Sequence, residues 1–187
     1  MLLKIVLGIA TLVTAERTPV VLVADVGVDD ASALIWLAKD PTVDLLGVAA
    51  SFGCHGDVRQ TAANARRVLR AAGRPCVPVY VGSPYALGES TPPSDDGSYV
   101  HGADGLGSVA EAPEESRLPS CHVDETLSAA EFIARTARER EVTIIVTSPL
   151  TNLALAYLLE PRLPELVTRT LIMGGAVRHP GNVSPLA

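Results

Sequence analysis

The sequence predicts an α/β protein whose open, mainly parallel sheet is covered by helices on both faces. Five short apolar runs alternate with segments of helical periodicity along the 187 residues. Neither a hairpin signal nor an internal repeat interrupts this alternation, so we expect parallel strands joined by right-handed crossovers. Hydrophobic residues make up 48% of the chain and aromatic residues only 4%. A core of Ala, Val and Leu is typical of parallel strands that are buried on both faces.

Each predicted strand is an apolar run bounded by polar residues, Gly or Pro. Their sequences in chain order are VVLVA, VDLLGVAA, VPVYV, VTIIV and TLIM. These runs occupy residues 20–24, 43–50, 77–81, 142–146 and 170–173.

Each predicted helix shows apolar residues three or four positions apart, which places them on one face. The predicted helices cover residues 31–39, 57–72, 126–138 and 153–159. Asp57 is the expected N-cap of the second helix, and Gly73 follows it as a C-terminal stop. Pro161 helps to end the fourth helix.

A long segment between the third strand and the third helix, residues 82–124, breaks this alternation. It is rich in Pro, Gly, Ser and acidic residues and shows little periodicity. A loop of this length in a compact domain is usually functional or disordered. Within it the motif HGADGLG, residues 101–107, stands out from flanking stretches that we expect to be solvated.

Three carboxylates follow the first strand within six residues, namely Asp25, Asp29 and Asp30. One explanation is helix capping, because acidic side chains accept hydrogen bonds from free N–H groups and suit the helix dipole. Three crowded carboxylates also repel one another, and a hard cation such as Ca²⁺ or the hydroxyls of a sugar relieve that repulsion. We favour the binding site over capping alone.

The other polar motifs also follow predicted strands. In parallel sheets of this kind, ligands bind beyond the carboxyl ends of the strands. The motifs at those ends are the acidic cluster, Cys54 with His55, HGADGLG, TSPLTN at residues 147–152, and MGG at residues 173–175. Their convergence is stronger evidence for a site than any single motif.

The charge and cysteine content exclude several other classes of protein. The net charge of −6 argues against a nucleic-acid binder. Three cysteines at wide spacing, without a CxxC motif, suggest neither a zinc site nor a disulfide framework. Cys54 and His55 are sequence neighbours whose side chains point to opposite sides of an extended chain, which disfavours a nucleophile–base dyad.

The N-terminal segment, residues 1–15, has one Lys, a short apolar core and a Val-Thr-Ala ending. This pattern favours a cleaved signal peptide and therefore a secreted protein. The alternative is an apolar N-terminal arm or extra strand on a cytoplasmic protein. The segment is too short for a membrane span.

With these motifs in order, the chain resembles the inosine–uridine-type nucleoside hydrolases over residues 19–187. The opening signature of that family is close to D-T-D-P-G-x-D-D-A, and residues 23–31 here are VADVGVDDA. The resemblance continues through RQTAANARRVL, VPVYVGSP, VHGADGLG, SPLTNLALA, LIMGGAV and GNVSP. It implies a Rossmann-like sheet and hydrolysis of ribonucleosides to base and ribose.

The resemblance also implies a calcium ion that holds the ribose diol and a water. By position, Asp25 would bind Ca²⁺ and act as the base toward that water. Asp30 would be the second carboxylate ligand, and the backbone carbonyl of Thr147 would be the third ligand.

Five further residues acquire substrate-related roles from the resemblance. Asp29 and Asn182 would contact the ribose, and Met173 would line its pocket. His55 lies near the place of a family asparagine that contacts ribose, so we assign it to substrate binding. His101 is the candidate acid for the leaving base, with stabilisation of its own loop as the alternative role.

The chain departs from the family pattern at several positions. Val23 stands where the family has its first Asp, Ala24 where it has Thr or Cys, and Val26 where it has Pro. The sequence stops at Ala187, where the family continues into a Glu-Phe-Asn segment and a later His-Asp pair. We therefore expect an incomplete domain, lacking its C-terminal part, with weak metal affinity and little or no turnover.

Two other functions compete with the nucleosidase. The first is a non-catalytic relative that binds nucleoside, ribose or a partner protein. The second, a phosphatase of the haloacid dehalogenase type, needs an Asp where Gly27 stands and is disfavoured. Because the nucleoside hydrolase family is commonly dimeric or tetrameric, a homo-oligomer is a further expectation.

Overall fold

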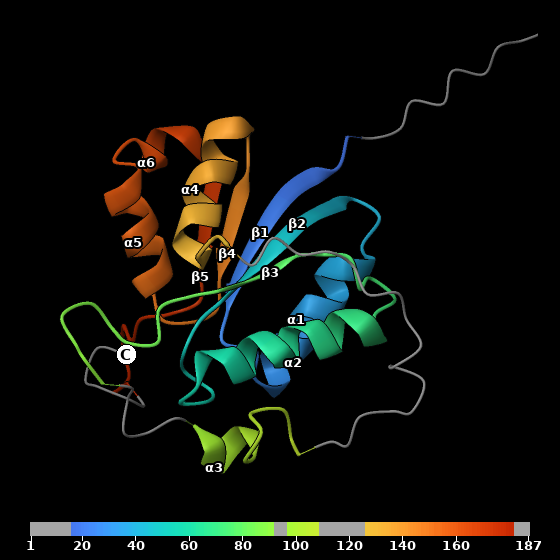
Figure 1. The fold of residues 1–187 in the computed structure, drawn as a ribbon, viewed down its shortest axis with the longest axis vertical. Helices are drawn as coiled ribbons and strands as arrows, with labels where there is room; N and C mark the ends of the chain where they lie inside the picture. Colours follow the sequence, from blue (N-terminus) through green and yellow to red (C-terminus); the bar gives the residue numbers. More distant parts are fainter. Residues whose placement is uncertain (1–15, 92–96, 109–125, 182–187) are drawn as a thin grey trace, which may run out of the picture.

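The computed structural model describes residues 16–91, 97–108 and 126–181, and these form one parallel five-stranded sheet (Figure 1). Its strand order is β3-β2-β1-β4-β5. The strands are β1 (Thr18–Ala24), β2 (Val43–Ala50), β3 (Val79–Val81), β4 (Thr143–Val146) and β5 (Arg169–Ile172). The chain moves outward from β1 to β3 on one side and then returns to build β4 and β5 on the other. β1 and β4 therefore flank the point where the strand order reverses, the usual place for a ligand.

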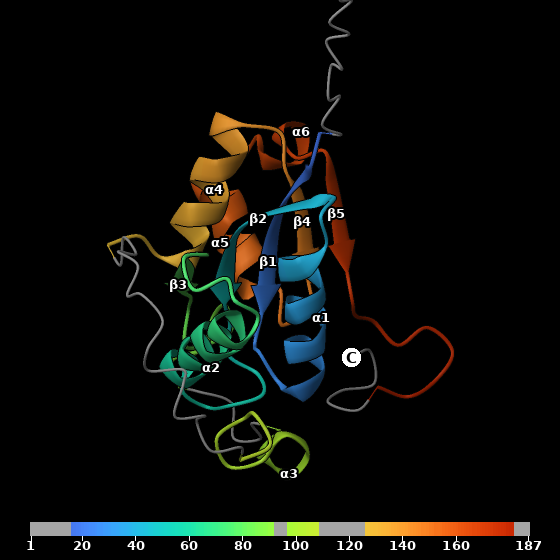
Figure 2. The same cartoon turned by 90° about the vertical axis from the view of Figure 1, so that its right-hand side faces the viewer.

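Helices cover both faces of the sheet, as the sequence predicts (Figure 2). One face carries α1 (Val28–Lys39) and α2 (Val58–Ala71). The opposite face carries α4 (Ala129–Glu139), α5 (Thr151–Leu159) and α6 (Leu163–Leu166). The single-turn helix α3 (Ser98–His101) lies apart from both layers, beyond the carboxyl ends of the strands.

The position of β1 in the middle of the sheet explains why the sequence of this strand is continuously apolar. Successive side chains of a strand point to opposite faces. Leu22 packs into the core beneath α1 and α2, whereas Val21 and Val23 pack into the core beneath α4. All three side chains are buried, so neither face of β1 meets water.

Most predicted boundaries agree with the structure to within three residues, and the differences have local causes. Asp57 caps α2 as expected, since its side chain accepts a hydrogen bond from the Arg59 N–H at 2.8 Å. Gly73 ends that helix with a φ of 73°. β3 begins later than predicted because Pro78 has no N–H to donate, although its carbonyl still accepts from the Val48 N–H. The helices α3 and α6 were not predicted, because a single turn has no measurable periodicity.

A capping box starts α4. The Ser128 hydroxyl accepts from the Glu131 N–H, while the Glu131 carboxylate accepts from the Ser128 N–H at 2.8 Å. We expect Ser128→Ala to lower the free energy of unfolding by about 1 kcal/mol, because it leaves helix N–H groups without their partner. Urea unfolding measures this. Ser32→Ala, at an exposed position inside α1, is the control and should change stability by less than about 0.5 kcal/mol. Equal losses in the two variants would contradict the prediction.

Three sequence expectations concern a signal peptide, a membrane span and disulfide bonds. The segment predicted as a signal peptide, residues 1–15, lies outside the described residues. Within the described ranges, no helix is long and apolar enough to span a membrane. Cys76 is disulfide-bonded, although the wide spacing of the cysteines suggested no disulfide framework. Cys54, by contrast, is a free and buried thiol.

Candidate active site

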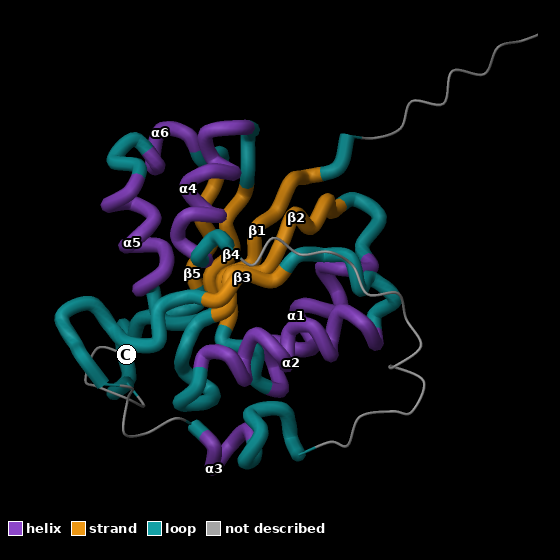
Figure 3. The backbone as a smooth tube through the Cα atoms, viewed as in Figure 1, coloured by secondary structure: helices purple, strands orange, loops and turns teal. Residues whose placement is uncertain are grey.

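Three strand ends bring polar side chains together at one edge of the sheet. Asp25 follows β1, Cys54 lies in the loop after β2, and Thr147 follows β4. These loops lie at the same end of the parallel strands (Figure 3). Asp25, Asp30 and Cys54 each offer one ligand atom within 4.8 Å of the others. All three are buried, with exposed fractions of 7%, 3% and 7%.

The Asp25 carboxylate is held by the loop after β2. The Cys54 N–H donates to Asp25 Oδ2 at 2.7 Å. This close approach requires Gly53, because a Cβ there would overlap the same carboxylate oxygen. Gly53 also has a φ of 146°, which L side chains rarely adopt. The Cys54 thiol also hydrogen-bonds Asp25, so the loop holds this carboxylate through both the backbone and the side chain of Cys54.

The Asp30 carboxylate is held at the start of α1. Gly27 is the N-cap, and its N–H donates to Asp30 Oδ2 at 3.0 Å. The Thr147 side chain also hydrogen-bonds Asp30. Capping, the simpler explanation of the acidic cluster, therefore applies to Asp30. It does not apply to Asp25, whose carboxylate accepts from the Cys54 N–H of another loop and hydrogen-bonds the Asp30 side chain.

The turn between these two carboxylates is strained. Val26 is fully buried and has a φ of 38°. Positive φ is an outlier for a β-branched residue and costs about 1–3 kcal/mol. Proline fixes φ near −65°, so this backbone could not accept the proline of the family signature at this position. Strain of this kind clusters at functional sites.

The two buried carboxyl groups are electrostatically frustrated. Burial raises the pKa of Asp25 above its usual range. Burial, together with the nearby charge of Asp25, raises the pKa of Asp30 to about 7. Neither group is ion-paired to a cationic side chain among the described residues. A bound divalent cation would relieve both the burial cost and the mutual repulsion, so the donor set fits a metal ion.

His101 lies next to the start of α1. The Nδ1 atom of His101, at the end of α3, accepts a hydrogen bond from the Val28 N–H at 3.3 Å. The same atom lies 4.0 Å from Asp29 Oδ1. Asp29 itself is largely exposed, with 64% of its side chain accessible. His101 and Asp29 therefore lie at the entrance, outside the buried Asp25–Asp30 pair.

The HGADGLG segment is attached to α2, which determines where His101 lies. The buried Asn64 side chain donates to the Asp104 carbonyl at 2.8 Å, and Arg67 pairs with the Asp104 carboxylate at 3.5 Å. That carboxylate also accepts from the N–H groups of Leu106 and Ser108. A compact, internally bonded loop thus presents the histidine.

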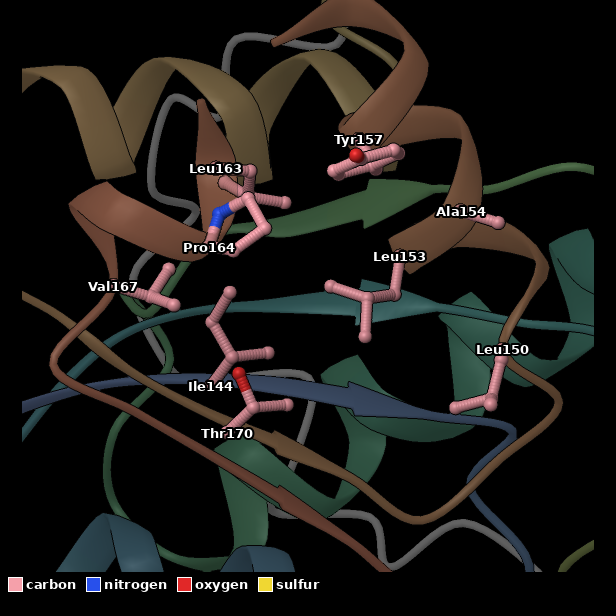
Figure 4. Close-up of a pocket in the computed structure, with 9 residues that line it drawn as sticks. All are labelled: Ile144, Leu150, Leu153, Ala154, Tyr157, Leu163, Pro164, Val167 and Thr170. Carbon is pink, nitrogen blue, oxygen red and sulfur yellow. The ribbon is translucent and has the colours of Figure 1, made fainter. Parts of the chain in front are cut away.

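A separate apolar pocket of about 310 Å³ lies between α5, α6 and the strands β4 and β5 (Figure 4). Ile144 and Thr170 line it from the strands, while Leu153 and Tyr157 project from α5. It contains no carboxylate, histidine or cysteine. Among the described residues its only polar side-chain groups are the hydroxyls of Tyr157 and Thr170, so the cluster at the strand ends is the candidate active site.

Comparison with known proteins shows to which family the chain belongs. The sequence model of the inosine-uridine preferring nucleoside hydrolases matches residues 20–187. The chain belongs to this nucleoside hydrolase family. The family is metal-dependent in general, in keeping with the buried carboxylate pair.

Individual relatives of this chain agree with the family assignment. It is 36% identical to uridine nucleosidase 1 of Arabidopsis thaliana, over 94% of this chain and 50% of the relative. It is 35% identical to the probable uridine nucleosidase 1 of Oryza sativa subsp. japonica, over 92% of this chain and 51% of the relative. A solved plant nucleoside hydrolase superposes with a TM-score of 0.78 at 30% identity, covering 90% of this chain and 51% of that structure. The chain therefore spans about half the length of the relatives it matches.

The structure brings together five of the site residues predicted from sequence. They form two adjoining groups, the inner Asp25, Asp30 and Thr147 and the outer Asp29 and His101. His55 is turned toward α2, where its Nδ1 accepts from the Asp57 N–H at 2.9 Å. Met173 is exposed beyond β5. Asn182 lies outside the described residues. The substrate roles of these last three remain predictions.

Four residues of the site had no individual role assigned to them from the sequence. Gly53 and Cys54 contact Asp25, and Asn64 holds the HGADGLG loop. Asn152, at the start of α5, donates to the Ala50 carbonyl and accepts from the Ser83 N–H, which ties the loops after β2 and β3 together. Buried Asn inside an apolar helical pattern was the available signal for Asn64 and Asn152, since an amide is rarely buried without a specific partner.

Cys54 is not a nucleophile in this environment. Burial, and next the negative charge of Asp25, raises the pKa of its thiol above the usual range. His55 bonds to Asp57, so the unfavoured Cys54–His55 dyad is not formed. We expect iodoacetamide to leave Cys54 unmodified in the native protein and to alkylate it fully in urea, because the thiolate is the reactive form. Mass spectrometry of the peptide containing Cys54 measures this, and rapid native labelling would contradict it.

Proposed function

We propose that the nucleoside hydrolase domain to which this chain belongs cleaves the N-glycosidic bond of ribonucleosides, releasing base and ribose. The observation that carries the proposal is the buried pair of Asp25 and Asp30 beside the entrance residues His101 and Asp29. The pair lies where the strand order reverses. The names of the curated relatives as uridine nucleosidases support the same substrate class.

The proposed cofactor is Ca²⁺, held by the carboxylates of Asp25 and Asp30 and by the backbone carbonyl of Thr147. Calcium takes carboxylate, carbonyl, hydroxyl and water oxygens in a flexible shell, which suits a mixed donor set. When bound, it would lower the pKa of a coordinated water and orient the ribose diol. The raised pKa values of both carboxyl groups in the absence of a cation support this assignment.

Side chains of the protein are assigned the other roles in the reaction. Asp25 accepts the proton of the attacking water, and a carboxylate of raised pKa is a stronger base than an exposed one. Asp29, at the entrance, accepts hydrogen bonds from ribose hydroxyls. The Nδ1 of His101 accepts from the Val28 N–H, so the neutral ring carries its proton on Nε2. That proton is available to the departing base as the sugar becomes oxocarbenium-like. Met173, Asn182 and His55 are the proposed further substrate contacts.

A ribose-release assay tests this function. The protein is incubated with uridine or inosine in Ca²⁺ or in a chelator, and free ribose is followed. We expect at most slow release from this chain, and any release to require Ca²⁺ and to be lost in Asp25→Asn, while Asp44→Asn, at a partly exposed position on β2, behaves as wild type. Calcium-independent release, or full activity in Asp25→Asn, would contradict the mechanism.

A non-catalytic nucleoside-binding protein is the second candidate, and one observation favours it. Val23, which stands where the family has a carboxylate, is fully buried in the apolar core beneath α4. The site therefore has one carboxylate fewer than the family pattern. Calcium-dependent binding of a nucleoside without any ribose release would select this function over the nucleosidase.

We also propose that the protein is secreted and self-associates. The disulfide at Cys76 supports an oxidising compartment. Exposed apolar side chains on α5 and β5, among them Tyr157, Leu158 and Leu171, support association with a second copy. Fractionation of the producing cells tests the first proposal, and light scattering of the purified protein tests the second. Retention inside the cell, or a strictly monomeric mass, would contradict them.

A further inference from the structure

We infer that Cys54 gives this site a second mode of metal binding, in which Asp25, Asp30 and the Cys54 thiolate hold a thiophilic divalent cation such as Zn²⁺ in competition with Ca²⁺. The inference shares its site with the proposed function. It depends on a sulfur donor that the proposed function does not use.

The donor geometry supports a shared ion. Three side chains from two loops and the start of α1 converge so that their ligand atoms lie within 4.8 Å of one another. Zinc holds thiolate sulfur at about 2.3 Å and carboxylate oxygen at about 2.0–2.2 Å, so donors on one tetrahedral ion lie roughly 3.4–3.6 Å from each other. Small side-chain rotations are enough to close the observed arrangement around a cation.

The Cys54 sulfur lies on the side of its loop that faces the two carboxylates. Cys54 is 7% exposed, and its own N–H is bonded to Asp25. Its Sγ packs so closely against Gly27 that a Cβ there would lie 2.5 Å away. The backbone that fixes Asp25 therefore also positions the thiol, and the sulfur lies close to both carboxylates rather than in the apolar core.

The donor chemistry separates the two cations. Calcium prefers six to eight oxygen ligands and gains little from sulfur. Zinc and cobalt accept thiolate, and two carboxylates with one thiolate leave one tetrahedral position open to water. On binding, the S–H proton is released to solvent as the metal–sulfur bond forms, with no change of oxidation state.

Cobalt(II) makes the sulfur ligand visible, because a thiolate bound to Co²⁺ gives a near-ultraviolet charge-transfer band. We expect this band when Co²⁺ is added to the whole chain without thiol reductants, and we expect one equivalent of Zn²⁺ to abolish it. Cys54→Ser should lose the band and weaken Zn²⁺ binding roughly tenfold or more, about 1.4 kcal/mol. Its Ca²⁺ affinity, measured by calorimetry, should change by less than about threefold. His179→Ala, an exposed histidine outside the site, should retain the band.

The two proposals fail in different ways. Co²⁺ binding without the band, or a band that persists in Cys54→Ser, overturns the sulfur ligand and leaves the calcium site intact. A band that depends on Cys54 in a protein that shows no Ca²⁺ isotherm supports the inference and overturns the calcium assignment. Circular dichroism of Cys54→Ser and Cys54→Ala confirms that a lost band reflects the ligand and not unfolding.

Discussion

Gly53→Ala will abolish the metal site and destabilise the fold. The added Cβ overlaps Asp25 Oδ2, so the carboxylate must rotate away from the Cys54 N–H. A buried N–H without a partner costs about 1–3 kcal/mol, and the left-handed backbone adds about 1–3 kcal/mol for a residue with a side chain. We expect a loss of roughly 2–5 kcal/mol in the free energy of unfolding, together with loss of Ca²⁺ binding. Urea unfolding and calorimetry measure the two effects.

Gly88→Ala is the matched control for this variant. Gly88 also has a positive φ, 86°, but a Cβ there would meet nothing within 4 Å. It should therefore show only the backbone cost of about 1–2 kcal/mol, with unchanged Ca²⁺ binding. If both variants lose the same stability and both bind Ca²⁺, the close approach of Gly53 to Asp25 contributes neither to stability nor to Ca²⁺ binding.

Asp30→Asn will stabilise the metal-free protein at pH 8 while it removes metal binding. The pKa of Asp30 is about 7 in the folded protein, against 3.8 for an ordinary carboxyl. A carboxyl whose pKa is raised on folding contributes stability that is present below pH 3.8 and lost as the pH rises through 7. Asparagine stays neutral, so the variant escapes this loss. The difference corresponds to roughly 4 kcal/mol at most, because one pKa unit is about 1.4 kcal/mol.

Urea unfolding between pH 5 and pH 8 in a chelator tests this prediction. Wild-type stability should fall across the range, and Asp30→Asn should fall much less. Asp29→Asn removes an exposed carboxylate from the same turn of α1 and should follow the wild-type profile. Parallel profiles for wild type and Asp30→Asn would show that the buried pair carries no electrostatic cost. Added Ca²⁺ should stabilise wild type and leave Asp30→Asn unchanged.

The fold could be predicted from sequence because its signals are local. An apolar run such as residues 43–50, ended by polar residues, matches β2 at both ends. Asp57 and Gly73 mark the two ends of α2 through their own backbone chemistry. The start of β3 was misplaced because Pro78 removes a hydrogen-bond donor from an otherwise strand-like run.

The site was only partly predictable, because its remaining features depend on contacts between distant segments. The acidic cluster is visible in sequence, since three carboxylates crowd one strand end. The approach of Cys54 to Asp25 joins residues 29 positions apart, and Asn64 reaches Asp104 across 40 positions. No local pattern encodes such contacts. The strained turn at Val26 was equally hidden, since valine gives no sequence signal for positive φ.

The position of β1 in the sheet has a consequence for the order in which the site assembles during folding. β1 pairs with β2 after a short crossover, so the Asp25–Cys54 contact closes a small loop. Pairing of β1 with β4 joins residues more than 120 positions apart, as in the bond from the Thr147 N–H to the Val23 carbonyl. Closing the longer loop costs more chain entropy and is slower. The half of the site made by Asp25 and Cys54 therefore forms early, and Thr147 completes it only when the distant strands join.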